Sequence, residues 1–372
     1  MTLILGIFVV SVVLSIGSVA LVMKISHRKG WYDQVDERKI HTGNIPRLGG
    51  IGFSFAFFIT MSGVGFYFIR TGVNVYRYLP CAAAMAFMLF SGIYDDLRPM
   101  LPRNKFFLQI IAALCVIIPG FTFDKLLYIG NGFFTDLGFL TIPITLLWVV
   151  GLTNAINFID GVDGLAGGVS ALITLFLGVI FFSYAGFSKP VLLCACMLGV
   201  LIGFLVFNAP IPKAKIFMGD CGSQFLGFSL AILPLMMEVN NPSTLPVLYA
   251  AALFAIPIFD TTAAVWRRLR DGRKVYDADK SHIHHKLMNL GLNSRGVIAV
   301  IYALQIIIGI LTYIAIHIEG PRSLIVLGAA YLIALIFFGA VHFMNRSTKN
   351  MKSKGANTEE NKDGLLTSPP AN

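Results

Sequence analysis

The chain has 372 residues, of which 56% are hydrophobic and 13% are charged, whereas an ordinary soluble domain has roughly 45–50% apolar and about 25% charged residues. A soluble protein of this length needs about twice as many charges on its surface. This composition, with a mean hydropathy of +0.76, therefore excludes an aqueous globular protein. The net charge of +10 fits either nucleic-acid binding or the basic cytoplasmic loops of a membrane protein.

Eleven apolar runs approach the length of about 20 helical residues that crosses a hydrocarbon core about 30 Å thick. They lie at 3–23, 48–69, 79–93, 104–120, 139–156, 165–185, 190–207, 222–237, 245–265, 297–318 and 322–344. We therefore predict an all-α polytopic membrane protein with about eleven transmembrane helices. Residues 1–345 are expected to form a single integral-membrane domain, and the polar residues 346–372 a disordered cytoplasmic tail.

The orientation follows from the first run, which has no basic segment before it and a basic segment, 24–29, after it. This pattern predicts an uncleaved span with the N-terminus outside and the C-terminus in the cytoplasm. On that map 24 of the 29 Lys and Arg lie inside and 5 outside, in agreement with the positive-inside rule. Residues 121–138 carry Asn131-Gly132 between short β-prone runs, which predicts a small external β-hairpin.

Chemically unusual polar residues gather on the predicted cytoplasmic side, in five separate loops. They are Asp95, Asp96 and Lys105 after the third span, Asn154, Asn157, Asp160 and Asp163 after the fifth, Asp220 in the motif that begins at Phe217 before the eighth, Asp260 at the end of the ninth, and His282, His284 and His285 beyond it. Carboxylates at a membrane surface are costly unless they are paired, hydrated or bound to a metal. Five loops on one face of the membrane therefore predict a single site.

These residue types together indicate phosphoryl transfer. Asp and Asn oxygens suit Mg²⁺, which shares its ligand shell with substrate phosphates, and the basic side chains can neutralise phosphate oxygens. Taken singly, the motifs have plainer explanations: Asp95-Asp96 as a solvated helix end, Asp220 as a turn residue, and the histidines as a zinc site or a pH sensor. The run 154–168, with two Asn and two Asp in ten residues between membrane spans, has no packing role that explains it.

As an ordered set, the motifs resemble the polyprenyl-phosphate N-acetylhexosamine-1-phosphate transferase family, of the glycosyltransferase family 4 type, over the whole membrane region. The matching motifs are His41-Thr-Gly-Asn-Ile-Pro-Arg47-Leu-Gly49-Gly50, Asp95-Asp96, Asn154-Ala-Ile-Asn157-Phe-Ile-Asp160-Gly-Val-Asp163-Gly, Phe217-Met-Gly-Asp220-Cys-Gly-Ser and His282-Ile-His284-His285. The resemblance implies a Mg²⁺-dependent enzyme that transfers N-acetylhexosamine 1-phosphate from a UDP-sugar to a long isoprenyl phosphate and releases UMP.

Roles for single residues follow from the resemblance alone. It implies that Asp220 and Asn157 hold Mg²⁺, with Mn²⁺ as a substitute, and that Asp95 and Asp96 act as a base or orient Lys105 or the metal. Lys105 and the histidines His282, His284 and His285 are implied near the diphosphate. The implied substrate-binding residues are Asn154, Asp160, Asp163, Asn208, Phe217 and Arg47. Asn208 departs from the muramoyl-pentapeptide branch, because two extra residues separate it from the Gly-Asp motif.

The sequence His-Ile-His-His-Lys at 282–286 also separates the chain from the muramoyl-pentapeptide transferases, which read His-His-His-Phe-Glu. It resembles the bacterial branch that starts O-antigen (lipopolysaccharide), enterobacterial common antigen, teichoic acid or arabinogalactan assembly in cell wall biogenesis. That branch implies UDP-GlcNAc as donor, undecaprenyl phosphate as acceptor, an inner-membrane location with a cytoplasmic active site, and no nucleic acid. A homodimer is a further expectation.

Several alternatives stay open at this stage. The sugar could be GalNAc, QuiNAc or FucNAc, or the donor UDP-MurNAc-pentapeptide, and the reaction could be one-step or pass through an aspartyl-phosphate. An ion-coupled transporter is the rival from another class, but it predicts acidic groups near mid-span. Pro257, inside the ninth span, predicts a bend that would form one wall of a groove for the isoprenyl tail.

Overall fold

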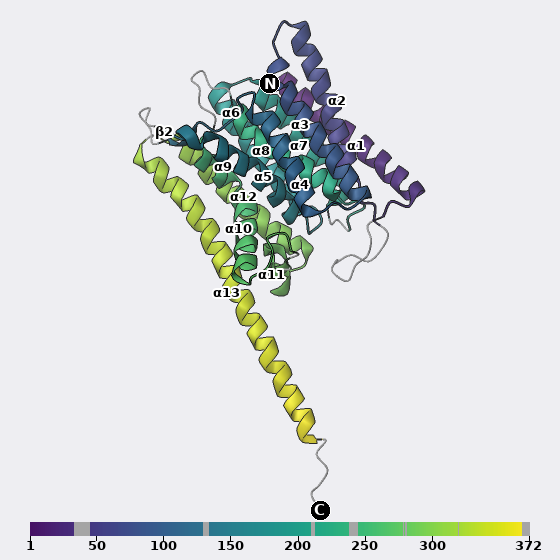
Figure 1. Cartoon of the computed structure of the whole chain (residues 1–372), viewed down its shortest axis with the longest axis vertical. Helices are drawn as coiled ribbons and strands as arrows, with labels where there is room; N and C mark the ends of the chain where they lie inside the picture. The colour runs from purple at the N-terminus through teal and green to yellow at the C-terminus, as the bar shows by residue number, and fades with distance from the viewer. Residues whose placement is uncertain are drawn as a thin grey trace, which may run out of the picture.

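The computed structural model describes residues 1–32, 45–128, 134–209, 213–237, 245–277, 279, 281–318 and 320–366. Most of these residues form a helical bundle, from which the long C-terminal helix projects (Figure 1). The thirteen α-helices are α1 (Thr2–Lys29), α2 (Gly49–Arg70), α3 (Leu79–Leu97), α4 (Pro102–Ile117), α5 (Thr141–Ile159), α6 (Leu165–Ala185), α7 (Lys189–Asn208), α8 (Gly219–Ile232), α9 (Val247–Leu253), α10 (Ala255–Arg270), α11 (Ile283–Asn289), α12 (Ser294–His317) and α13 (Pro321–Leu366). Three short 3-10 helices, η1 (Tyr76–Tyr78), η2 (Gly138–Leu140) and η3 (Leu233–Met236), extend helical segments.

The predicted all-α membrane fold is confirmed. Among the described residues, eight helices are long and apolar enough to cross a membrane, and α9 with α10 makes a ninth if the bent pair is counted as one span. Two further predicted spans correspond to shorter helices, α4 with 16 residues and α8 with 14. The count of eleven spans therefore remains a prediction.

A two-stranded antiparallel sheet lies inside the segment predicted to form a hairpin. β1 (Lys125–Tyr128) pairs with β2 (Phe134–Asp136), with Tyr128 opposite Phe134. The predicted turn at Asn131-Gly132 lies outside the described residues. The position of this sheet outside the membrane remains a prediction.

The ninth span is broken, but the break is not at Pro257. α9 ends at Leu253, α10 begins at Ala255, and their axes differ by 87°. Pro257 is the third residue of α10, where the missing N–H would have no partner within the helix. The location predicted for the bend was therefore wrong by three residues, because a proline in a first turn is compatible with a continuing helix.

The last helix, α13, runs from Pro321 to Leu366 and passes the boundary predicted at residue 345. Only its first part is apolar: the candidate membrane span is Pro321–Thr348. The division into a membrane domain of residues 1–345 and a disordered tail of residues 346–372 remains a prediction.

α8 lies at the centre of the bundle and packs against α2, α3 and α5. Glycines allow this approach, because a Cβ atom on Gly92 would lie 2.5 Å from Cys221 Cα and one on Gly50 would lie 2.8 Å from Cys221 Sγ. Close backbone contact through small residues is the usual way in which membrane helices associate. On the far side of α8, Trp148 Nε1 donates to the carbonyl of Ala231 at 2.9 Å and fixes α5.

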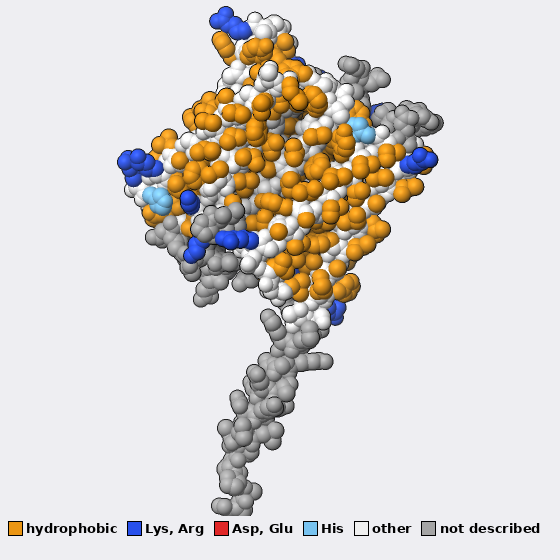
Figure 2. Space-filling model, turned by 180° about the vertical axis from the view of Figure 1, so that it is seen from behind, with side chains coloured by type: hydrophobic (Ala, Val, Ile, Leu, Met, Phe, Trp, Pro, Cys, Tyr) orange, Lys and Arg blue, Asp and Glu red, His pale blue; other side chains and the backbone are white. Residues whose placement is uncertain are grey.

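The outer surface suits a bilayer. Figure 2 shows a broad face covered by hydrophobic side chains, with Lys, Arg and His at its edges and no acidic side chain of the described residues in view. Large exposed apolar groups on the bundle include Phe90 at 68% and Leu147 at 74%. An apolar face of this extent on a water-soluble protein would promote aggregation, so the chain is a multi-pass membrane protein.

Candidate active site

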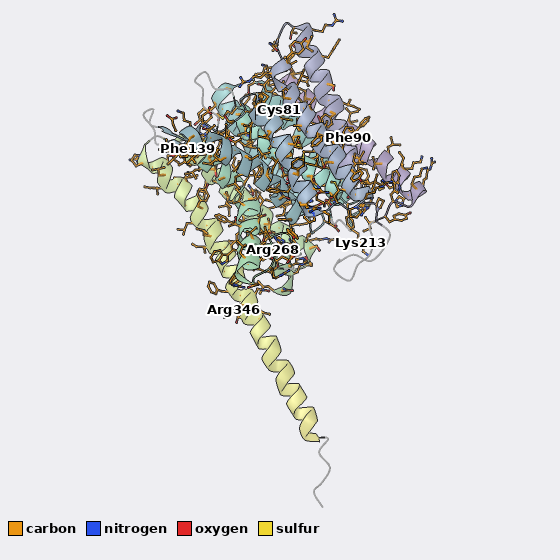
Figure 3. All side chains as sticks on the ribbon, viewed as in Figure 1. Cys81, Phe90, Phe139, Lys213, Arg268 and Arg346 are labelled. Atoms are coloured by element: carbon orange, nitrogen blue, oxygen red, sulfur yellow. The ribbon has the colours of Figure 1, made fainter. Side chains whose placement is uncertain are left out.

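The loops that the sequence places on one side of the membrane meet at one end of the bundle. Backbone hydrogen bonds join Gly49 N to Phe217 O at 2.9 Å, Gly50 N to Met218 O at 2.9 Å, and Phe217 N to Pro46 O at 2.8 Å. We call this the motif end and define it by residues 46–50, 91–105, 154–164 and 217–224. Figure 3 shows Lys213, Arg268 and Arg346 toward this end of the molecule, whereas Cys81 lies toward the other.

Asp96 fixes the first turn of α8. Its two carboxylate oxygens accept hydrogen bonds from the backbone N–H groups of Asp220 at 3.1 Å and Cys221 at 2.9 Å. The first N–H groups of a helix have no partner within it, and its N-terminus attracts negative charge. Asp96 is 5% exposed, so its contacts orient Asp220 and leave little access for a substrate.

Lys105 bridges two further acidic groups of the motif end, Asp95 and Asp220. Its Nζ atom forms an ion pair with Asp95 and another with Asp220, the latter at 3.2 Å. Asp95 also accepts a hydrogen bond from Met100 N at 2.8 Å, and its side chain is 1% exposed. Lys105 and Asp220 are more accessible, at 28% and 36%. The buried carboxylate therefore holds the lysine, and the lysine and Asp220 face outward.

Asn157 of α5 completes this group. Its Nδ2 donates to Asp220 Oδ1 at 2.7 Å and to Ser223 Oγ at 2.7 Å. No group of three or more His, Cys, Asp or Glu in the described part of the chain has the arrangement of a metal site. The residues nevertheless suit Mg²⁺, because this ion is usually held by one or two carboxylates together with substrate phosphates and water, and Asp220 is the accessible carboxylate.

Asp160, at the C-terminal end of α5, lies in the field of these acidic groups. The pKa of Asp160 is raised to about 7, mainly because the side chain is buried. The negative charges of Asp220, Asp163 and Asp96 raise it further. Acidic groups that repel one another in this way favour the binding of a cation or of a hydrogen-bond donor. Asp160 and Asp163 therefore lie near the metal-binding candidates, and their role in substrate binding remains a prediction.

The histidine cluster packs against the same loop. His284 is 2% exposed, and a Cβ atom on Gly161 would lie 2.6 Å from its Nε2. The ring of His285 lies 4.3 Å from that of His284. Burial and the neighbouring His285 lower the pKa of His284 to about 3, so this imidazole is neutral near pH 7 and carries no charge for a diphosphate.

His282, the first member of the cluster, is paired with Asp260 of α10. The distance from His282 Nδ1 to Asp260 Oδ2 is 2.8 Å. Hydrogen bonds to Asp279 anchor the loop that precedes His282. Arg267 Nη2 donates to Asp279 Oδ2 at 2.6 Å, and Ser281 N donates to Asp279 Oδ1 at 2.9 Å. α10 therefore places the histidine cluster beside the motif end.

Two predicted substrate-binding residues are engaged within the protein. Asn154 exchanges hydrogen bonds with Gln109 of α4, at 2.6 and 3.3 Å. Asn208 is 3% exposed; its Oδ1 accepts from Gly164 N at 2.9 Å and its Nδ2 donates to Ile216 O at 2.9 Å. Both amides join neighbouring segments in this structure. A role of these two residues in substrate binding remains a prediction that these contacts do not support.

Arg47 and Phe217 lie at the motif end with half-buried side chains. The segments that carry them pair through their backbones, as described above. The first part of the motif that begins at His41 lies outside the described residues, because the structure describes the chain again only from residue 45.

The sequence singled out Asp260 and, as the last residue of the Phe217 motif, Ser223, but gave neither a role, and it did not single out Gln109 or Arg268. Arg268 is 3% exposed, and its guanidinium carbon lies 5.5 Å from the ring centroid of Phe158. A polar residue inside an apolar segment is the available signal for Gln109 and Asp260, because such residues are costly without a partner. Arg268 follows Arg267 in a basic stretch at the end of α10, where nothing in the sequence distinguishes it.

Comparison with known proteins gives a consistent assignment. Residues 78–238 match the model of glycosyl transferase family 4. A protein of Bacillus subtilis (strain 168) described as a probable undecaprenyl-phosphate N-acetylglucosaminyl 1-phosphate transferase is 35% identical over 311 residues, which cover 82% of each chain. Undecaprenyl-phosphate alpha-N-acetylglucosaminyl 1-phosphate transferases are similar as well: that of Escherichia coli (strain K12) is 30% identical over 85% of this chain and 84% of its own, and that of Yersinia pestis 27% identical over 91% and 93%.

Proposed function

Because the chain belongs to glycosyl transferase family 4, we propose that it transfers GlcNAc 1-phosphate from UDP-GlcNAc to undecaprenyl phosphate. The products are undecaprenyl-diphosphate-GlcNAc and UMP. The relatives in Bacillus subtilis and Escherichia coli carry names that describe this chemistry. The reaction would be the first membrane step of a cell-envelope polysaccharide in a bacterial inner membrane.

One observation carries the proposal: the accessible pair of Lys105 and Asp220, backed by the buried Asp95 and joined by Asn157. A lysine held by a buried carboxylate keeps its ammonium in one place. Fixed positive charge is what a phosphoryl-transfer transition state needs, since charge spreads over the phosphoryl oxygens. The transporter alternative has no comparable support, because the acidic residues lie at helix ends at the motif end.

In the proposed reaction a phosphate oxygen of the lipid attacks the β-phosphorus of UDP-GlcNAc in line with the leaving group. The bond from that phosphorus to the bridging oxygen breaks, and UMP leaves with the electron pair. Lys105 stabilises the negative charge that develops on the phosphoryl oxygens. Because the lipid phosphate is already ionised near pH 7, Asp95 need not remove a proton, and its contact with Lys105 supports an orienting role.

Asp220 and Asn157 are the proposed Mg²⁺ ligands, since their oxygens are the accessible hard donors of the group. Bound there, Mg²⁺ would neutralise the diphosphate. Asp96 contributes indirectly, because its hydrogen bonds to the backbone of Asp220 and Cys221 fix the first turn of α8. Among the histidines, burial keeps His284 neutral, so the proposal assigns the contact with the diphosphate to His285 and to His282, which is 6% exposed.

The acceptor must reach the motif end from the bilayer. The 87° bend between α9 and α10 turns α10 away from the direction of α9, and α10 exposes Trp266 at 69% and Leu269 at 58%. An amphipathic helix with exposed large apolar groups suits the membrane interface. We propose that the isoprenyl tail lies along α10, with its phosphate toward Lys105 on the cytoplasmic side.

The test is direct. Purified protein in detergent receives Mg²⁺, undecaprenyl phosphate and one labelled donor at a time: UDP-GlcNAc, UDP-GalNAc, UDP-QuiNAc, UDP-FucNAc or UDP-MurNAc-pentapeptide. We expect a lipid-diphosphate-sugar and UMP from UDP-GlcNAc, identified by mass spectrometry, and reversal when excess UMP is added. Transfer from a different donor alone would replace the proposed sugar, and absence of product from every donor with folded protein would refute the reaction.

A further inference from the structure

A buried acidic side chain outside the Lys105 group contacts the histidine cluster directly. Asp260 of α10 is 1% exposed, and both of its oxygens are engaged: Oδ2 with His282 Nδ1 at 2.8 Å, and Oδ1 with the backbone N–H of Ile283 at 2.8 Å. A carboxylate at this depth is costly without such partners. The two hydrogen bonds fix both the position of residue 282 and the rotation of its ring.

The rest of the His282 ring packs toward the last turn of α5, which carries Asn157. Its centroid lies 5.9 Å from that of Phe158, the residue that follows Asn157, and 5.9 Å from the parallel ring of His284. Within the described part of the chain, the side chain of His282 forms its hydrogen bond through Nδ1, to the carboxylate of Asp260. A carboxylate can only accept there, so Nδ1 carries the proton and Nε2 is the nitrogen available to a ligand.

We propose that Asp260 is a positioning residue: it holds the His282 ring with a proton on Nδ1, so that, when Nε2 takes up a proton from water, the Nε2–H donates to a diphosphate oxygen in the transition state. This inference rests on the proposed function. No covalent step is added, because Asp260 neither gains nor loses a bond to substrate. Its influence passes through one hydrogen bond to His282.

Asp279, the acidic residue in the loop before His282, makes contacts that are purely structural. Asp279 pairs with Arg267 and with the backbone of Ser281, and so anchors the loop before His282. The loop therefore has an anchor independent of Asp260. The contact between Asp260 and the imidazole adds control of the ring itself, since a backbone anchor fixes neither tautomer nor charge.

Kinetics with a double-mutant cycle test the proposal. We expect Asp260→Asn to lower kcat by about 10–100-fold, as for other residues that orient a functional histidine, while KM for UDP-GlcNAc changes less than about threefold. In a His282→Ala background the same substitution should change kcat less than about twofold, because the group through which it acts is absent. Asp271→Asn, the same change at the exposed end of α10, should leave kcat unchanged. Equal losses in both backgrounds would overturn the proposal.

NMR measures the protonation of the His282 ring nitrogens directly and does not depend on turnover. The protein is labelled with ¹⁵N-histidine, and the His282 signals are assigned as those that are absent from His282→Gln. The Nδ1 resonance of His282 should be that of a protonated nitrogen. In Asp260→Asn, the amide oxygen must accept from Ile283 N, so the amide NH₂ faces the ring and the proton should move to Nε2. An unprotonated Nδ1 in the unmodified protein overturns the proposal even if the variant does not fold. A protonated Nδ1 without any sugar transfer would refute the proposed reaction and leave the Asp260 contact confirmed.

Discussion

The motif end of the bundle and the end opposite to it are packed by different rules. At the motif end, α2 and α3 touch the first turn of α8 through Gly50 and Gly92. Toward the opposite end, apolar side chains of α2, α3 and α7 and the side chain of Lys189 line a cavity of about 160 Å³. An apolar cavity of about that size stays dry and accepts apolar molecules.

The difference shows that the two ends of the bundle need different precision of packing. Positioning charged groups requires near-contact of backbones, because a shift of about 1 Å already disrupts a constellation held by hydrogen bonds. The opposite end carries no such constellation among the described residues, and its apolar side chains can leave space that lipid chains fill. Paired substitutions at the two ends should therefore have very unequal effects.

The largest effect is expected at Asp220. Chelation of divalent metal should reduce turnover below about 1%, added Mg²⁺ should restore it, and Asp220→Asn should raise the Mg²⁺ concentration for half-maximal activity by roughly tenfold or more. The matched change at the opposite end is Asp136→Asn in β2, which should leave the Mg²⁺ dependence unaltered. Titration of turnover against Mg²⁺ checks both variants, and equal Mg²⁺ dependence would remove Asp220 from the metal site.

Lys105 provides the next comparison. Lys105→Met should lower kcat by about 10²–10³-fold, because a fixed positive charge is lost where the phosphoryl oxygens become more negative. Lys189→Met removes the same charge at the opposite end, where Lys189 lies 5.2 Å from the ring centroid of Tyr78, and should leave kcat unchanged. Initial rates at saturating substrate decide the matter, and similar losses in the two variants would contradict the role of Lys105.

Two glycines of α2 test how closely this helix packs. Gly50→Ala introduces a Cβ that would clash with the backbone nitrogen of Gly222 and should lower the free energy of unfolding by about 3 kcal/mol, the upper end of the usual cost of overpacking. Gly63→Ala, with nothing within 4 Å, should be neutral or stabilising by up to about 1 kcal/mol. Thermal unfolding in one detergent compares them, and a tolerated Gly50→Ala would mean that α2 and α8 lie further apart.

The smallest effect concerns pH. Because burial lowers the pKa of His284 to about 3, while an unfolded histidine titrates near 6.5, the folded protein binds fewer protons and loses stability as pH falls below about 6.5. His284→Gln has no such group. Between pH 7 and pH 5 its free energy of unfolding should therefore fall by about 1–2 kcal/mol less than that of the unmodified protein. Unfolding curves at both pH values check this, and parallel losses would show that His284 becomes protonated in the fold.

Several features followed from the sequence because they depend on local physics. Apolar runs of membrane length predicted nearly every long helix, and the polar runs after the third and fifth spans and before the eighth identified Asp95, Asn157 and Asp220 before any contact was known. The shorter helices α4 and α8 were harder to assign, since a bundle can cover their ends. Pro257 misled, because local sequence does not reveal whether a proline falls in the first turn of a helix or in its middle.

What each polar residue does was decided by tertiary structure. Asp95 and Asp96 are adjacent and chemically identical, yet one holds Lys105 and the other caps α8, 124 residues away along the chain. Asn208 and Asn154 resemble ligand residues in the sequence and join helices and loops in the fold. Hydropathy and charge are properties of a segment and so determined the membrane fold and the end that carries the chemistry. Hydrogen-bond partners depend on which segments pack together, and only the folded chain brings them within 3 Å.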